Sequence, residues 1–110
     1  MEKSSSKIKG NLDIFIAQNE EEYGGNITKW QNILIHGDPE GLRSLAMILL
    51  KLADTDQNDL VDLPEGAREH VHLRPKYDLS SSSEELIVGR LDAKGTGAFY
   101  DRYVPASTVP

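Results

Sequence analysis

Three histidines are the residues of this 110-residue chain best suited to chemistry, and two of them stand two positions apart. His70 and His72 flank Val71, so on a β-strand their side chains would project from the same face. His36 ends an earlier apolar run and could supply a third imidazole. Three imidazoles around an open position form a catalytic zinc site. The same residues also suit a polar surface that contacts another protein, and we expect this second arrangement, without a bound metal.

The acidic segment from Asp54 to Glu65 resembles a calcium-binding loop of the EF-hand type. The residues at its ligand positions are Asp54, Asp56, Asn58, Asp62 and Glu65. The sixth position, which needs glycine for a sharp turn, is Asp59, and Pro64 weakens the helix that should follow. We therefore interpret the segment as a solvated acidic connector without calcium.

No other group of residues indicates catalysis. The serines at 80–83 lack the strand–turn–helix context of a nucleophile elbow, and Gly95-Thr96-Gly97 lacks the lysine and helix of a phosphate loop. No pair of carboxylates is marked by its spacing as a general acid and base. These absences favour a binding protein that is not an enzyme and that uses no cofactor.

A helix from about Pro39 to Asp54 is the most clearly predicted structural element. Asp38 can cap the first free N–H groups, Pro39 suits the first helical position, and Glu40 favours the positive end of the helix dipole. The apolar residues at helical spacing are Leu42, Leu45, Ala46, Leu49, Leu52 and Ala53, widened by Ile48 and Leu50. Such a stripe must be covered, and only the flanking strands can cover it.

Four strands are predicted around this helix, in the order ββαββ. Alternating apolar residues indicate the first strand, and a polar loop with the Gly24-Gly25 turn signal joins it to the second as an antiparallel hairpin. Pro75 stops the third strand. The predicted strands cover residues 12–17, 27–35, 69–74 and 85–91, and the polar loop covers 19–26.

The predicted fold is α+β, with one domain over residues 1–110. We expect a sheet of about four strands, antiparallel or mixed, with the one principal helix on one face. Residues 1–9 are predicted to form a loose tail. Residues 93–110 are predicted to form an irregular tail, in which Phe99, Tyr100 and Tyr103 contact the body.

The face of the sheet opposite the helix is expected to carry the functional residues. In the third strand, Val71 and Leu73 share a face, which turns the alternate residues outward. These outward residues are His70, His72 and Arg74. If Ile33 of the second strand also meets the helix, His36 is outward too. All three histidines are then expected on the open face.

Composition excludes several classes of protein. A formal net charge of −6 argues against nucleic-acid binding, which needs a basic footprint, but it permits a basic protein partner. The chain has no cysteine, and residues 1–10 lack the apolar region of a secretory signal. No apolar run approaches the roughly 18 residues of a membrane span. We expect a cytoplasmic protein that contacts neither nucleic acid nor membrane.

Several short motifs together resemble the immunity protein 32 family. They are HGDPEGL at 36–42, the apolar helix at 45–53, EHVHLRP at 69–75 and SEELIV at 83–88, so the resemblance covers roughly residues 33–92. The matching positions are Gly37, Asp38, Gly41, Leu42, His70, His72, Leu73, Pro75 and Glu85. Asp38 would cap the helix, Gly41 would let the helix approach the sheet, and Leu42 and Leu73 would be core. His70 and His72 lack such a structural explanation.

The resemblance implies a small α+β protein of bacterial polymorphic toxin systems, which binds and neutralises a cognate toxin without catalysis. We expect inhibition by occlusion, in which an acidic surface meets a basic toxin cleft. The expected partner-binding residues are His36, His70, His72, Arg74, Asp59, Asp62 and Glu65. The alternatives are a small metal-dependent enzyme that uses the histidines, and a structural subunit without separate activity. The sequence leaves the oligomeric state open.

Overall fold

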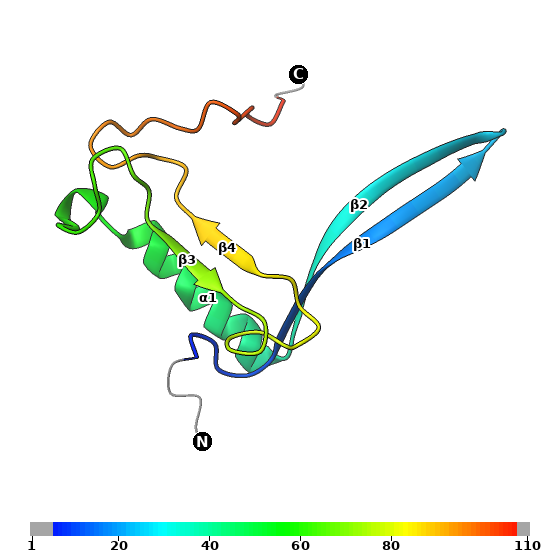
Figure 1. The fold of residues 1–110 in the computed structure, drawn as a ribbon, viewed down its shortest axis with the longest axis horizontal. Helices are drawn as coiled ribbons and strands as arrows, with labels where there is room; N and C mark the ends of the chain where they lie inside the picture. The colour runs from blue at the N-terminus through cyan, green and yellow to red at the C-terminus, as the bar shows by residue number, and fades with distance from the viewer. Residues whose placement is uncertain (1–5, 108–110) are drawn as a thin grey trace.

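A computed structural model describes residues 6–107, which form a small body and a long hairpin that projects from it (Figure 1). The body contains the helix α1, the short helix η1 and the strands β3 and β4, and the hairpin consists of β1 and β2. The elements are β1 (Leu12–Tyr23), β2 (Asn26–Gly37), α1 (Pro39–Asp54), η1 (Gln57–Asp59), β3 (His70–Leu73) and β4 (Leu86–Gly89). The predicted ββαββ order of the principal elements is confirmed.

The prediction of a single sheet is wrong. β1 pairs with β2 and β3 pairs with β4, each antiparallel, in two separate two-stranded sheets. The Ser80 N–H donates to the Leu12 carbonyl at 2.9 Å, and the Glu84 N–H donates to the Ile14 carbonyl at 2.7 Å. These bonds join β1 to the segment before β4. β4 begins only at Leu86, where the two strands already diverge (Figure 1), so no ladder forms between them.

The helix α1 has the predicted bounds and the predicted cap. The Asp38 carboxylate accepts a hydrogen bond from the Gly41 N–H at 2.7 Å, and Pro39 opens the first turn. A Cβ at Gly41 would collide with the backbone of Asn11. The glycine therefore lets the start of the helix lie against the segment that enters β1. This agrees with the prediction that Gly41 allows the helix to approach the sheet.

Only one line of the predicted apolar stripe is buried. Leu45 and Leu52 are buried and Ile48 packs against the core, whereas Leu49 is 45 % exposed. The predicted core positions that are exposed instead are Leu42, Ala46, Leu49, Leu50 and Ala53. The reason is geometric: two short strands are narrower than the predicted four-stranded sheet and cover less of the helix.

The core joins the helix to the base of the hairpin and to β3. Its buried residues are Ile8, Leu12, Ile14, Leu45, Leu73 and Leu79. Ile8 belongs to the segment expected to form a tail, of which residues 1–5 lie outside the described residues. Residues 93–107 contain no helix or strand, and residues 108–110 of the expected C-terminal tail also lie outside the described part.

The hairpin is longer than predicted. The polar stretch 19–26 was expected to be a loop, yet β1 continues to Tyr23 and β2 resumes at Asn26. Only Gly24 and Gly25 turn, with φ of +58° and +84°, which is the left-handed conformation that a two-residue hairpin turn requires. The radius of gyration is 17.8 Å, against about 13 Å for a compact chain of this length.

Candidate functional site: the open face of β3 and β4

The face of β3 that points away from α1 carries two histidines. Leu73 is fully buried and Val71 half-buried on the helix side, whereas His70 and His72 are exposed on the other side. The two imidazole centroids lie 5.0 Å apart. The predicted inward and outward faces of this strand are therefore confirmed.

The strand β4 completes this face. Ile87 pairs with His72 and is exposed, and Gly89 pairs with His70. A Cβ at Gly89 would lie 3.0 Å from the Cβ of His70, so the glycine leaves room for that side chain. His72 Nδ1 donates to the Glu85 carboxylate at 3.3 Å, and His70 Nδ1 donates to the Arg68 carbonyl at 3.0 Å. A hollow next to these histidines is also lined by Arg68, Tyr100 and Arg102.

Arg68 fastens the C-terminal segment beside this hollow. Its guanidinium donates to the Leu91 carbonyl at 2.6 Å and to the Ala98 carbonyl at 2.7 Å. The same group lies 3.8 Å from the centroid of the Tyr100 ring, within the range of a cation–π contact. The expected contact of Tyr100 with the body is therefore present, and two of the N–H donors of Arg68 bond within the chain.

The acidic connector does not have the geometry of a calcium loop. Asp56 caps η1 by accepting from the Asn58 N–H at 3.1 Å, and Asn58 accepts from the Gly95 N–H at 3.0 Å. The Lys94 ammonium donates to the carbonyls of Leu60 and Leu63, both at 2.6 Å. These two carbonyl oxygens are therefore already hydrogen-bonded to a cationic side chain, which a calcium ion would have to displace. Within residues 6–107, no three histidine or acidic side chains lie close enough to hold a metal ion together.

The other predicted site residues lie apart from the histidine pair. His36 is on β2, with its ring 5.3 Å from that of Phe15, and it lines a separate hollow with Asp13 and Ser80. Arg74 follows β3, and its guanidinium lies 5.0 Å from the centroid of the Tyr77 ring. Asp59, Asp62 and Glu65 are exposed on the connector. The structure thus brings His70 and His72 together and leaves His36 on the hairpin.

The sequence model of the immunity protein 32 family matches residues 32–91, more than half of the chain. The chain belongs to the immunity protein 32 family. The match includes α1, the connector, β3 and β4, and therefore both histidines of the open face, but it begins only within β2. No curated protein and no solved structure matches this chain. Among the described residues, no helix is long and apolar enough to cross a membrane.

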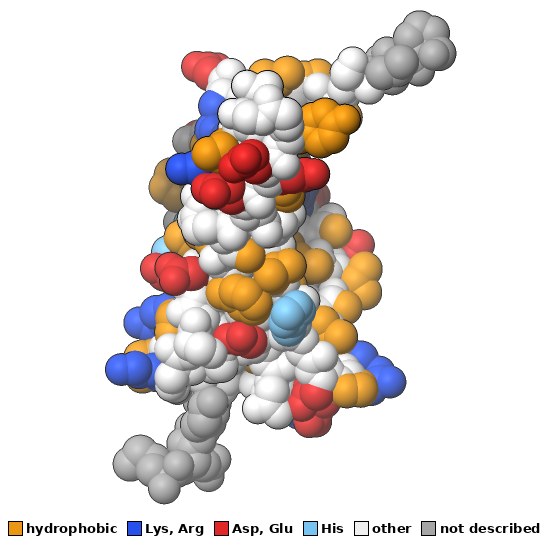
Figure 2. All heavy atoms as spheres, turned by 90° about the vertical axis from the view of Figure 1, so that its right-hand side faces the viewer, with side chains coloured by type: hydrophobic (Ala, Val, Ile, Leu, Met, Phe, Trp, Pro, Cys, Tyr) orange, Lys and Arg blue, Asp and Glu red, His pale blue; other side chains and the backbone are white. Residues whose placement is uncertain are grey.

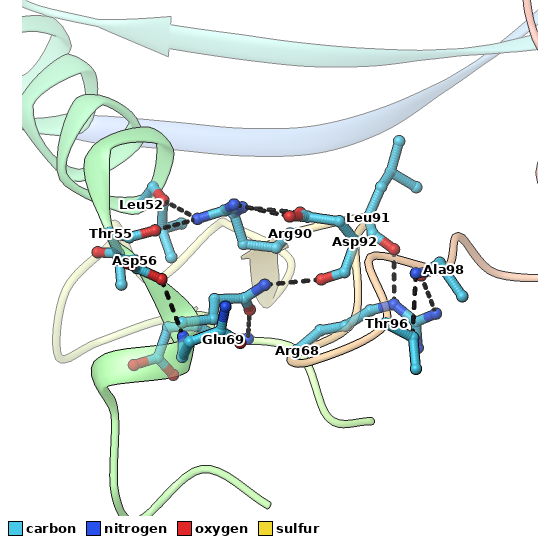
Figure 3. A network of polar contacts seen from close by, with 12 residues as sticks. Leu52, Thr55, Asp56, Arg68, Glu69, Arg90, Leu91, Asp92, Thr96 and Ala98 are labelled. Carbon is cyan, nitrogen blue, oxygen red and sulfur yellow. Dashed lines mark hydrogen bonds and ion pairs between the residues drawn. The ribbon is translucent and has the colours of Figure 1, made fainter. Parts of the chain in front are cut away.

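In this immunity protein 32 family member, Arg90 joins the end of α1 to the end of β4 (Figure 3). Its guanidinium donates to the carbonyls of Leu52 and Thr55 at 2.9 and 2.6 Å, and to both Asp92 carboxylate oxygens at 2.9 and 2.8 Å. Because the guanidinium donates to the carboxylate, the pKa of Asp92 is lowered and that of Arg90 is raised. The sequence did not predict this pair. The only signal was that Arg90 directly follows an apolar strand and Asp92 comes two residues later.

The buried Gln57 extends the same network toward the open face. Its side-chain amide donates to the Asp92 carbonyl at 2.8 Å, and its side-chain carbonyl accepts from the Glu69 N–H at 2.7 Å. Gln57 therefore holds the residue before β3 in place and so positions His70. Nothing in the sequence distinguished this glutamine from its exposed polar neighbours.

The serine run is also structural. The Asp13 carboxylate accepts from the hydroxyls of Ser80, Ser82 and Ser83 at 2.5, 2.6 and 3.3 Å. These bonds lower the pKa of Asp13, with that from Ser80 the largest cause. They attach the segment before β4 to the base of the hairpin.

Proposed function

We propose that this protein is an immunity protein that binds a cognate bacterial toxin and neutralises it by covering the toxin's active surface. The observation that carries the proposal is membership of the immunity protein 32 family across α1, β3 and β4. In this proposal the protein acts in the cytoplasm of the producing cell and catalyses no reaction.

The open face of β3 and β4 is the proposed contact surface. Its centre is formed by His70, His72 and Ile87, which are all exposed. No described contact requires the two imidazoles for folding, since each makes one exposed hydrogen bond. The tail beside Arg68 borders the surface on one side. Ile87 is the apolar residue of this centre, and the two imidazoles provide groups that can form hydrogen bonds with a partner.

The acidic connector supports a basic partner. Asp59, Asp62 and Glu65 are exposed, and the chain as a whole carries a net charge of −6. Exposed charges of one sign steer an oppositely charged partner and raise the association rate, and salt screens this effect. Arg74 and His36 are proposed as further contacts, Arg74 beyond the end of β3 and His36 on the hairpin.

The test first searches the genes next to this one for a toxin domain and then measures binding of that domain to the protein. The double variant His70→Ala with His72→Ala should weaken toxin binding at least tenfold and reduce protection of the cell, because buried anchors at an interface carry most of the binding energy. Its melting temperature should change little, since both side chains are exposed. The variant His36→Ala tests the outlying contact on the hairpin separately, because it removes one imidazole from a separate hollow, and it should weaken toxin binding less than the double variant does.

The outcomes separate the possible contact surfaces. A well-folded double variant that binds and protects like the wild type would exclude the open face of β3 and β4. Loss of toxin binding in His36→Ala, with normal binding by the double variant, would place the contact on the hairpin. If the wild-type protein neither binds that toxin nor protects the cell from it, the proposed function is wrong for this protein and that toxin. The association rate should also fall as salt rises, while the dissociation rate changes less.

A further inference from the structure

The outer edge of β2 is a long row of unpaired backbone groups. Within the described residues, β2 forms a ladder only with β1. The carbonyls of Leu12 and Ile14 point away from β2, because they accept from Ser80 and Glu84. In an antiparallel ladder, the residues paired with these also direct their N–H and C=O groups outward. The outward residues of β2 are therefore Ile27, Lys29, Gln31, Ile33, Ile35 and Gly37.

Some of these outward residues of β2 also have exposed apolar side chains. Residues that pair directly across the ladder share a face, so Ile33 and Ile35 lie on the face of the buried Ile14. Ile33 is 71 % exposed. The apolar face that closes the core therefore continues along the hairpin beyond the body. A long, exposed, apolar strand edge is usually covered in a stable protein.

The surface area of the whole chain is large for its mass. The chain exposes 8640 Å², whereas a compact monomer of 12.2 kDa is expected to expose about 6,100 Å². The excess is larger than the roughly 800 Å² that each partner buries in a standard interface. β2 contributes to this excess because nearly all of its residues are exposed, and this is the surface that a second copy would cover.

Charge favours a second copy as the occupant of the edge. β2 contains no carboxylate and one cation, Lys29, while the consecutive glutamates at 20–22 lie on β1. Figure 2, in which the hairpin points toward the viewer, shows hydrophobic side chains across the middle of the view and acidic side chains above them. Two β2 strands can thus meet without direct repulsion between carboxylates, whereas the basic toxin expected for an acidic protein would find no carboxylate on this edge.

We propose that β2 pairs antiparallel with β2 of a second copy about a two-fold axis, which forms a continuous four-stranded sheet in the order β1-β2-β2-β1. An antiparallel edge is self-complementary, as a two-fold interface requires. The pairing satisfies the outward backbone groups of both strands and leaves the open face of β3 and β4 on each copy free. The dimer is therefore independent of the proposed toxin contact at β3 and β4, and among the proposed contacts only His36 lies on the strand that pairs.

The test compares two glutamines that pair with each other on opposite edges of the hairpin, Gln18 on β1 and Gln31 on β2. Both direct their N–H outward, so proline at either position removes no bond between β1 and β2. Either substitution also removes the same side-chain hydrogen bond between the two residues. Gln31→Pro should raise the dimer dissociation constant at least tenfold, and Gln18→Pro should leave it unchanged. Light scattering with size-exclusion chromatography measures the mass, which should be twice 12.2 kDa for the wild type.

Amide hydrogen exchange of the wild-type protein provides a second measurement that does not depend on a variant. In the dimer, the N–H groups of Gln31 and Ile33 should exchange slowly, while the outward N–H of Gln18 exchanges fast. A monomeric wild type at high protein concentration would overturn the proposal. So would equal dissociation constants for the two proline variants, or fast exchange at Gln31 and Ile33.

Discussion

Asp38 and Asn11 are joined by three hydrogen bonds although 27 residues separate them in the chain. The Asp38 carboxylate accepts from the Asn11 backbone N–H at 3.0 Å and from its side-chain amide at 2.7 Å. The Asp38 N–H in turn donates to the Asn11 carbonyl at 3.2 Å. Because the same carboxylate caps α1, one residue both starts the helix and attaches it to the chain that enters β1.

Replacing Asp38 with Ala should therefore destabilise the protein more than loss of a helix cap alone. The variant loses the bond to Gly41 as well as both carboxylate bonds to Asn11. We expect a lower urea midpoint with an unchanged slope. Asp54→Ala is the matched control, because it removes an exposed carboxylate from the negative end of the same helix and should leave the midpoint unchanged or raise it slightly.

Two leucines one helical turn apart should respond differently to truncation. Leu45→Ala should cost about 2–5 kcal/mol, because Leu45 is buried in the core. Leu49→Ala should cost less than about 1 kcal/mol, because nearly half of the Leu49 surface is exposed and it lies outside the core. Chemical denaturation of both variants measures the difference. Equal losses would mean that another element covers Leu49 in solution.

Acid should destabilise this protein below about pH 4. The pKa values of Asp13, Asp38 and Asp92 lie below the ordinary 3.8, owing first to the hydrogen bonds from Ser80, Asn11 and Arg90 respectively. A carboxyl group whose pKa is lower in the folded state stabilises that state above its unfolded pKa. This contribution is lost as pH falls through the folded pKa. Ser80→Ala should raise the pKa of Asp13 toward its ordinary value, which a carboxyl NMR titration would detect.

Arg90→Lys should not preserve the stability that Arg90 provides. A lysine ammonium cannot donate in parallel to both Asp92 oxygens and also reach the carbonyls at the end of α1. We expect a loss of about 1–2 kcal/mol, less than for a fully buried pair because both side chains are partly solvated. Thermal unfolding measures this loss. Arg43→Lys, at an exposed helix position, is the control and should have no effect.

Thermal melts with and without a metal chelator should superimpose. A metal that binds only the folded state would raise the melting temperature, and the Lys94 ammonium already occupies two carbonyls of the acidic connector. Chelator sensitivity that disappears in His70→Ala would instead support the metal-dependent enzyme. The same sensitivity lost in Asp54→Ala would support a calcium loop.

Local patterns predicted the elements whose residues interact with near neighbours in the chain. Asp38 and Pro39 defined the start of α1 because capping depends on residues within one turn. The alternation around Val71 predicted which side of β3 faces the helix, since successive strand residues always point to opposite faces. The short motifs from 36 to 88 also indicated the correct family.

The tertiary structure alone decided how these elements meet. Because β1 and β4 diverge beyond Ile14, the strands form two narrow sheets, which leaves Leu49 exposed. Among the described residues, β2 pairs only with β1, so its other edge is free. The roles of Arg90 and Lys94 likewise depend on carbonyls 31 or more residues away in the chain. Helix spacing and strand alternation describe which face a residue occupies. They contain no information about which distant segment covers that face, because the packing of the whole chain determines that contact.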